Sequence, residues 1–234
     1  EYWEKHDGLP KGLDLTSYFD YDIRRLPETW FSVDAIPNYE EIIEEDDETK
    51  IIVNGWGAKM RYWKGKAGTP EHLEFDLDSA EKWKNKYREH MLSFDIKRLG
   101  DIEKLKAAYN KAMSEDRFVC YNNMIIFEIM RRSFGDVNML ELMYLDPELI
   151  NDFCEVVTNN IIIHYEYAFR EVGIPDGVWF YEDMGYTNAP FISPKFYEEQ
   201  IFPHHKRIVD FVHSYNIPVI MHSCGKIRPY LPYI

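Results

Sequence analysis

The sequence predicts an α/β protein and, within that class, part of a (β/α)8 barrel. Three short apolar segments with the character of buried strands lie at residues 118–121, 177–183 and 217–224. A segment with helical spacing joins the last two, and a strand, a helix and a second strand in this order form a βαβ unit with parallel strands. This alternation favours a barrel over a sandwich or a helical bundle. An open doubly wound sheet is the alternative, but no glycine-rich phosphate loop supports it.

Length and composition fit one globular domain over residues 1–234. The chain is 45% hydrophobic and 16% aromatic, which supplies ample material for a core and excludes a disordered protein. We expect a loop- and hairpin-rich amino-terminal part, residues 1–90, followed by βα units over 91–234. The chain begins without Met and stops inside what looks like an unfinished element, so we expect a fragment whose last barrel segments are missing.

The amino-terminal part is acidic and rich in turns. Residues 51–55 and 60–65 have the pattern of two strands around an Asn-Gly turn, which predicts a hairpin. Residues 69–75 form a third extended candidate. Four basic residues lie on or near this hairpin: Lys59, Arg61, Lys64 and Lys66. We expect them to form a solvated face, with binding of an anionic substrate as the alternative.

Helix signals begin near residue 79. Apolar spacing predicts helices at about 80–87 and 102–113. Asp146-Pro147 is a strong helix start. The Asp side chain accepts hydrogen bonds from the free amides of the first turn, and Pro at the first helical position has no N–H that would be left unpaired. That helix is expected to run to about residue 170, and Ser193-Pro194 should open another that extends to about 215.

Charge and cysteine content narrow the classes of partner. Twenty-seven Lys and Arg against 41 Asp and Glu leave a net charge of −14, which repels a phosphate backbone or an anionic membrane surface. We therefore expect neither nucleic acid nor membrane as a partner. Apolar runs are far shorter than a spanning helix requires. Three cysteines are too few for a disulfide framework, so a cytoplasmic location is expected.

Polar side chains follow each of the three predicted strands, where barrels place their active sites. They are Asn122 and Asn123, Glu182 and Asp183, and His222 and Cys224. We expect Glu182 and Asp183 to act in catalysis and Asn122 and Asn123 to contact a cofactor. The alternative is that the two acids cap a loop or pair with a lysine.

His222 and Cys224 form the most specific of these pairs. They are two residues apart, so in an extended strand both side chains point to the same face. Imidazole and thiolate are zinc ligands, and Glu182, at the tip of the neighbouring strand, could supply a third. The alternative is a strand-end His that caps a loop beside a Cys that packs. His164, His204 and His205 lie in predicted helices and are expected to be solvated or packed in the core.

Three motifs, in this order and spacing, resemble the uroporphyrinogen decarboxylase superfamily. They are Glu182-Asp183-Met184-Gly185, the helix start at Ser193-Pro194, and the strand from Pro218 that ends in His222-Ser223-Cys224-Gly225. The resemblance implies a (β/α)8 barrel and one of two chemistries. One is cofactor-free decarboxylation of tetrapyrrole side chains, and the other is zinc-dependent methyl transfer with methylated corrinoid proteins. Decarboxylases carry Asp-Ser-Trp near position 182 and lack the His-x-Cys motif, so this chain resembles the methyltransferase branch.

The resemblance also implies roles for individual residues. His222 and Cys224 match two zinc ligands, and Glu182 matches a carboxylate that can lie at the metal. A third protein ligand, a Cys one barrel segment further along, would fall beyond Ile234. The implied activity is transfer of a methyl group between a corrinoid protein and a thiol or another small acceptor. A uroporphyrinogen-type decarboxylase and a non-catalytic corrinoid-binding barrel are the alternatives.

Overall fold

A parallel sheet forms the centre of the computed structural model, which describes residues 2–13, 15–66 and 68–234. Its strands are β1 (Ile23–Arg25), β6 (Phe118–Met124), β7 (Gly177–Tyr181) and β8 (Val219–His222), paired in that order. Every pairing is parallel. The three strands expected from the sequence are therefore confirmed, and β1 joins them from a segment with no strand signal of its own.

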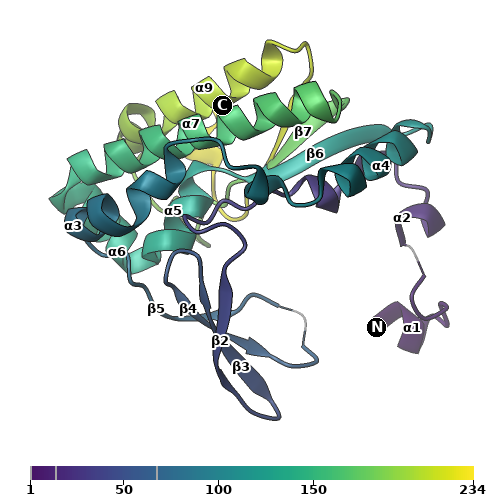
Figure 1. Cartoon of the computed structure of the whole chain (residues 1–234), viewed down its shortest axis with the longest axis horizontal. Helices are drawn as coiled ribbons and strands as arrows, with labels where there is room; N and C mark the ends of the chain where they lie inside the picture. The colour runs from purple at the N-terminus through teal and green to yellow at the C-terminus, as the bar shows by residue number, and fades with distance from the viewer. Residues whose placement is uncertain (1, 14, 67) are drawn as a thin grey trace.

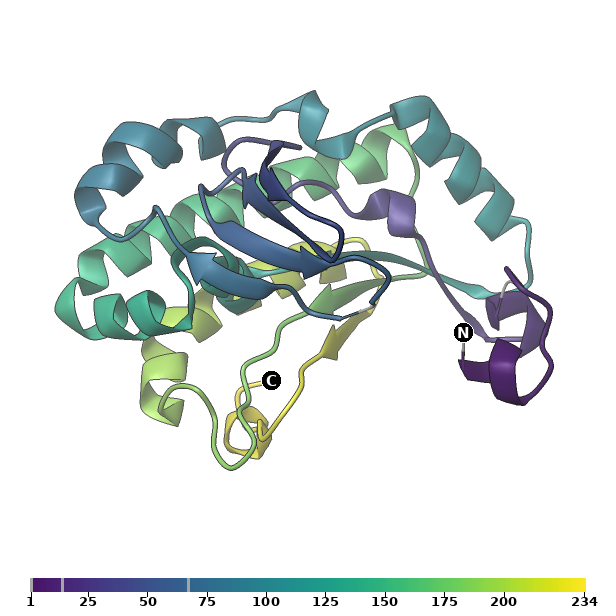
Figure 2. The same ribbon diagram turned by 90° about the horizontal axis from the view of Figure 1, so that it is seen from below.

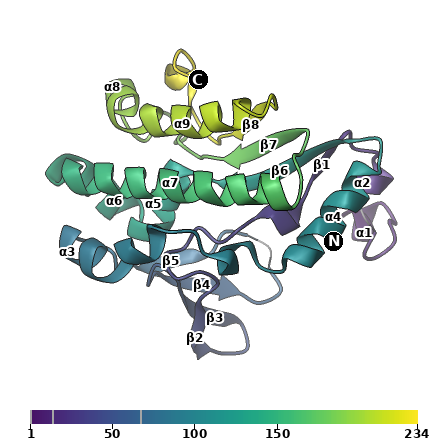
Figure 3. The same cartoon turned by 45° about the horizontal axis from the view of Figure 1, so that its top comes forward.

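Helices cover one side of this sheet. The helices α9 (Phe202–His213), α7 (Pro147–Glu171) and α4 (Ile102–Met113) lie side by side along it (Figures 1 and 3). Val178 and Phe180 of β7 face these helices and are fully buried, whereas Trp179 and Tyr181 face the opposite side and are only half-buried. Parallel strands in sequential order with helices on one side are the wall of a (β/α)8-type barrel. The predicted fold class is confirmed.

The other helical segments are short. They are α1 (Tyr2–His6), α2 (Leu15–Tyr18), η1 (Pro27–Thr29), α3 (Ala80–Lys82), η2 (Trp83–Tyr87), η3 (Arg88–Met91), η4 (Ile96–Leu99), α5 (Ile126–Phe134), α6 (Asp136–Leu145), α8 (Pro194–Phe196), η5 (Tyr197–Ile201) and η6 (Arg228–Tyr230). Within the described residues, no helix combines the length and the apolar character that crossing a membrane requires.

The amino-terminal part contributes a second, antiparallel sheet. Its strands are β2 (Glu40–Glu45), β3 (Thr49–Asn54), β4 (Lys59–Trp63) and β5 (Glu71–Glu74), in that order. The expected hairpin is β3–β4. The basic side chains on it pair with acidic neighbours: Lys59 with Glu74, Arg61 with Glu71, and Lys64 with Glu45. All are about half exposed, which is the solvated face that the sequence predicts.

Both helix starts predicted from Pro dipeptides are confirmed. Asp146 accepts a hydrogen bond from the Leu149 amide at 3.1 Å, and α7 runs from the next residue to Glu171. Ser193 caps Phe196 in the same way. The second helix is interrupted, because Pro203 has no N–H to donate, and a π-helical turn, η5, precedes α9.

Helices α7 and α9 pack through a buried polar contact. His204 of α9 is 5% exposed, and its Nδ1 lies 3.2 Å from the Thr158 hydroxyl of α7. Burial lowers the pKa of His204 from 6.5 to about 4. Both His204 and His205 are core residues, which confirms one of the two outcomes that the sequence allowed.

We expect His204 to make the fold sensitive to acid. The unfolded chain takes up a proton on this side chain near pH 6.5 but the folded chain only near pH 4, so stability is lost as pH falls between these values. The loss from pH 7 to pH 5 should be about 2 kcal/mol. Urea unfolding at both pH values should show a smaller loss for His204→Gln, whereas the exposed control His213→Gln should behave as wild type. Equal losses in wild type and His204→Gln would contradict this assignment.

Candidate metal centre at the tips of β7 and β8

The carboxyl ends of β7 and β8 are tied together by backbone and side-chain hydrogen bonds. Tyr181 pairs with His222 in the parallel register. The Glu182 amide then donates to the His222 carbonyl at 2.9 Å, and the Met184 amide donates to the Ser223 hydroxyl at 3.1 Å. The loops that follow the two strands run on side by side (Figure 2). Side chains that leave these two tips on the same side therefore meet.

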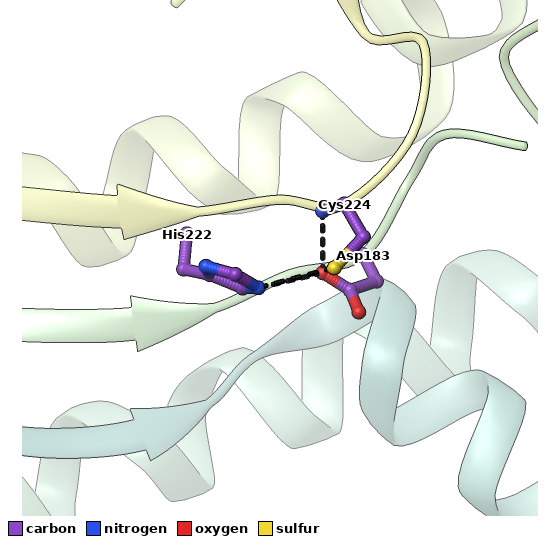
Figure 4. Close-up of side chains that lie close together, drawn as sticks. All are labelled: Asp183, His222 and Cys224. Atoms are coloured by element: carbon purple, nitrogen blue, oxygen red, sulfur yellow. Dashed lines mark hydrogen bonds and ion pairs between the residues drawn. The ribbon is translucent and has the colours of Figure 1, made fainter. Parts of the chain in front are cut away.

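Asp183, His222 and Cys224 form such a cluster (Figure 4). One ligand atom of each lies within 4.8 Å of the others. His222 Nε2 is 3.3 Å from Cys224 Sγ and 3.5 Å from Asp183 Oδ1. Ligands of a tetrahedral zinc ion lie about 3.3–3.6 Å apart, given the usual zinc–nitrogen and zinc–sulfur bond lengths. The donor types and their spacing both fit zinc.

The cluster is open on one side. The side chain of His222 is 40% exposed, Asp183 is half-buried and Cys224 is exposed. The Tyr181 ring packs 5.5 Å from the His222 ring and covers one flank. The Cys224 thiol beside the Asp183 carboxylate has a raised pKa, chiefly because the two groups hydrogen-bond. A bound metal would instead lower the pKa of this thiol, because a thiol that coordinates a metal is deprotonated.

The Glu182 side chain does not lie in this cluster, and Asp183 takes the place that the sequence analysis expected for it. Successive residues of an extended strand point to opposite sides, so Glu182 and Asp183 cannot both face His222. Asp183 takes the position facing the cluster. The Glu182 carboxylate is fully buried on the other side, where it meets the start of α5 and His205. The acid that the structure brings to His222 and Cys224 is therefore the neighbour of the one expected from the sequence.

The side chains of Asn122 and Asn123 donate hydrogen bonds to backbone carbonyls and do not face the cluster. Nδ2 of Asn122 donates to the Leu26 carbonyl, and Nδ2 of Asn123 donates to the Phe31 carbonyl. Both side chains are buried and fix the segment after β1 against β6. Asn122 also borders a cavity of about 690 Å³. The expected cofactor contact is thus compatible with Asn122 alone, since Asn123 is enclosed.

His205 was not recognised from the sequence as part of the site region. It lies 23 residues from Glu182 in the chain, and two adjacent histidines in a helix carry no signal of their own. Its imidazole links Glu182 to Tyr197: Nε2 is 2.5 Å from the carboxylate, and Nδ1 is 3.1 Å from the Tyr197 hydroxyl. Only the tertiary structure brings these groups together.

The chain folds as a barrel wall with a candidate metal centre at its strand tips. Residues 127–234 match the family model described as Uroporphyrinogen decarboxylase (URO-D). The resemblance to that superfamily, which rested on the motifs of β7 and β8, is therefore confirmed.

A solved structure with the same fold is a methyltransferase from Methanosarcina mazei. It superposes with a TM-score of 0.57 at 12% sequence identity, over 93% of this chain and 56% of the other. This chain thus corresponds to little more than half of that methyltransferase. No curated protein matches the sequence.

Proposed function

We propose that the full-length protein is a zinc-dependent methyltransferase that moves a methyl group between a corrinoid protein and a thiol or another small acceptor. The observation that carries the proposal is the Asp183, His222 and Cys224 cluster, with ligand spacing suited to zinc. The His-x-Cys motif supports it further, because the decarboxylases of the superfamily lack that motif. The three cysteines are unbonded, which agrees with our proposal of a cytoplasmic location.

The geometry suits activation of a thiol. Zinc bound here would lower the pKa of a thiol so that a thiolate exists at neutral pH. Asp183, His222 and Cys224 offer one donor atom each and leave the solvent side open for such a substrate. In transfer to the thiol, a sulfur–carbon bond forms while the cobalt–carbon bond breaks. The electron pair stays on cobalt, which passes from Co(III) to Co(I), and the thiol proton goes to solvent.

Removal of either His222 or Cys224 should abolish metal binding. We expect about one zinc ion per chain in the wild-type protein, and a loss of affinity of roughly a hundredfold or more in His222→Ala and Cys224→Ala. Elemental analysis and competition with a coloured chelator measure this. His213→Ala, an exposed histidine outside the cluster, is the control. Unchanged zinc content in the two cluster variants would refute the proposed site.

Turnover tests the activity separately. The wild-type protein should demethylate methylcobalamin in the presence of 2-mercaptoethanol, followed by the change in cobalamin absorbance, and the cluster variants should not. Binding of a corrinoid protein without turnover of any methyl donor would instead point to a non-catalytic barrel.

One observation favours a second candidate, decarboxylation of a tetrapyrrole. Arg25 borders the cavity of about 690 Å³, donates to the Tyr181 hydroxyl and stacks 5.1 Å above the Trp179 ring. In the described part of the chain it has no carboxylate partner, so it is available to hold a carboxylate of a substrate. Release of carbon dioxide from uroporphyrinogen without a corrinoid protein would support this alternative.

A further inference from the structure

Glu182 connects three elements that are distant in the sequence. Its Oε1 accepts from the Phe127 amide at 2.7 Å and from His205 Nε2 at 2.5 Å, and its Oε2 accepts from the Glu128 amide at 3.1 Å. The carboxylate is fully buried, and His205 is 3% exposed. A buried carboxylate is stable only when its oxygens are hydrogen-bonded, and these three donors belong to α5 and α9 rather than to β7.

The bonds to α5 replace a missing helix cap. The N-cap position of α5 is Ile125, which has no side-chain acceptor for the free amides of the first turn. Glu182 supplies that acceptor from the neighbouring strand. Its negative charge also lies at the positive end of the α5 dipole. The tip of β7 is thereby fixed to the start of α5.

Glu182 is also joined, through its backbone, to the cluster of Asp183, His222 and Cys224. The Glu182 amide donates to the His222 carbonyl, and the next residue, Asp183, accepts from the Cys224 amide at 2.7 Å. Arg131 of α5 also reaches the Asp183 carbonyl at 3.5 Å. The anchored Glu182 and the cluster member Asp183 are therefore adjacent residues of one backbone segment that is hydrogen-bonded to the tip of β8.

We propose that Glu182 and His205 are positioning residues that hold Asp183 in register with His222 and Cys224 by fixing the tip of β7 to α5 and α9. The proposal rests on the proposed function in so far as the cluster binds zinc. It assigns to Glu182 a part distinct from that of a ligand: the carboxylate sets the geometry of the cluster without touching the metal.

Glu182→Gln is the first test, because the amide has the same shape but only one accepting oxygen. We expect a drop in zinc affinity of about 10- to 100-fold and an altered visible spectrum of the cobalt-substituted protein. The matched control is Asp152→Asn. Asp152 also accepts three hydrogen bonds, from Trp83 and Arg88, but it lies outside the cluster. That variant should lose stability while zinc affinity and the cobalt spectrum stay as in wild type.

His205 provides a second test that leaves the bonds from Glu182 to α5 in place, should Glu182→Gln fail to fold. His205→Phe keeps a ring but donates nothing, so zinc affinity should fall as in Glu182→Gln. His205→Gln can still donate to the carboxylate and should restore most of the affinity. Equal zinc affinity and identical cobalt spectra in wild type, Glu182→Gln and His205→Phe would overturn the proposal.

Hydrogen exchange separates failure of this inference from failure of the proposed function. If the wild-type protein binds no zinc, the proposed function fails and the positioning role is still decided by exchange rates. Backbone amides over residues 183–186 and 222–226 should exchange faster in Glu182→Gln than in wild type or Asp152→Asn. Unchanged rates there would overturn the positioning role, whether or not the cluster binds metal.

Discussion

Gly225→Ala should separate the tips of β7 and β8 and destroy the candidate metal centre. Gly225 has a φ of +75°, and a Cβ atom there would lie 2.2 Å from the Gly185 carbonyl oxygen. The neighbouring atoms belong to backbone that carries Asp183 on one side and Cys224 on the other, so relief of the overlap must move the cluster. We expect a loss of about 2–5 kcal/mol in stability together with the loss of zinc binding.

Gly65→Ala is the matched control for this experiment. Gly65 has a φ of +68°, but a Cβ atom there would have no neighbour within 4 Å. Only the cost of the left-handed backbone remains, which is about 1–2 kcal/mol. Thermal or urea unfolding with zinc titration compares the two variants. If Gly225→Ala is no less stable than Gly65→Ala and binds zinc as wild type does, the close approach of the two loops is not essential to the site.

Phe153→Ala should be the most destabilising change in the core. Phe153 of α7 is fully buried, and its ring centre lies 4.9–5.6 Å from those of Trp56, Trp83 and Phe134. These rings join the loop after β3 to the helices around α7. Truncation removes the contacts and leaves a cavity, which we expect to cost about 3–5 kcal/mol.

Tyr144→Ala controls for the removal of an aromatic ring as such. Tyr144 lies near the end of α6 and is 87% exposed, so its loss should change stability by about 0.5 kcal/mol or less. Urea unfolding measures both variants. A loss in Phe153→Ala as small as in Tyr144→Ala would show that the aromatic cluster does not stabilise the fold.

Local signals predicted much of the secondary structure. The start of α7 followed from Asp146-Pro147, because capping depends only on residues within one turn. The hairpin β3–β4 followed from strand pattern around a turn. By contrast, β1 was missed, since three residues show no periodicity and pair with β6, nearly a hundred positions away. The π-helical turn before Pro203 was missed as well, although the extent of that helical region was correct.

One part of the candidate site could likewise be predicted from the sequence, and another part could not. That His222 and Cys224 face the same point could be predicted from the sequence, because residues two apart on a strand share a face. Which acid joins them depends on how the tip of β7 lies against β8. A shift of one residue reverses the direction of a side chain, so only the observed register selects Asp183 over Glu182.

The sequence by itself determined the α/β class, the superfamily resemblance and the two donors of the His-x-Cys motif, since each depends on residues close together in the chain. The tertiary structure alone decided that Asp183 completes the cluster and that Glu182 is buried between α5 and α9. The physical reason is that a buried carboxylate needs donors to satisfy it. Those donors come from positions 127, 128 and 205, which only folding brings to residue 182.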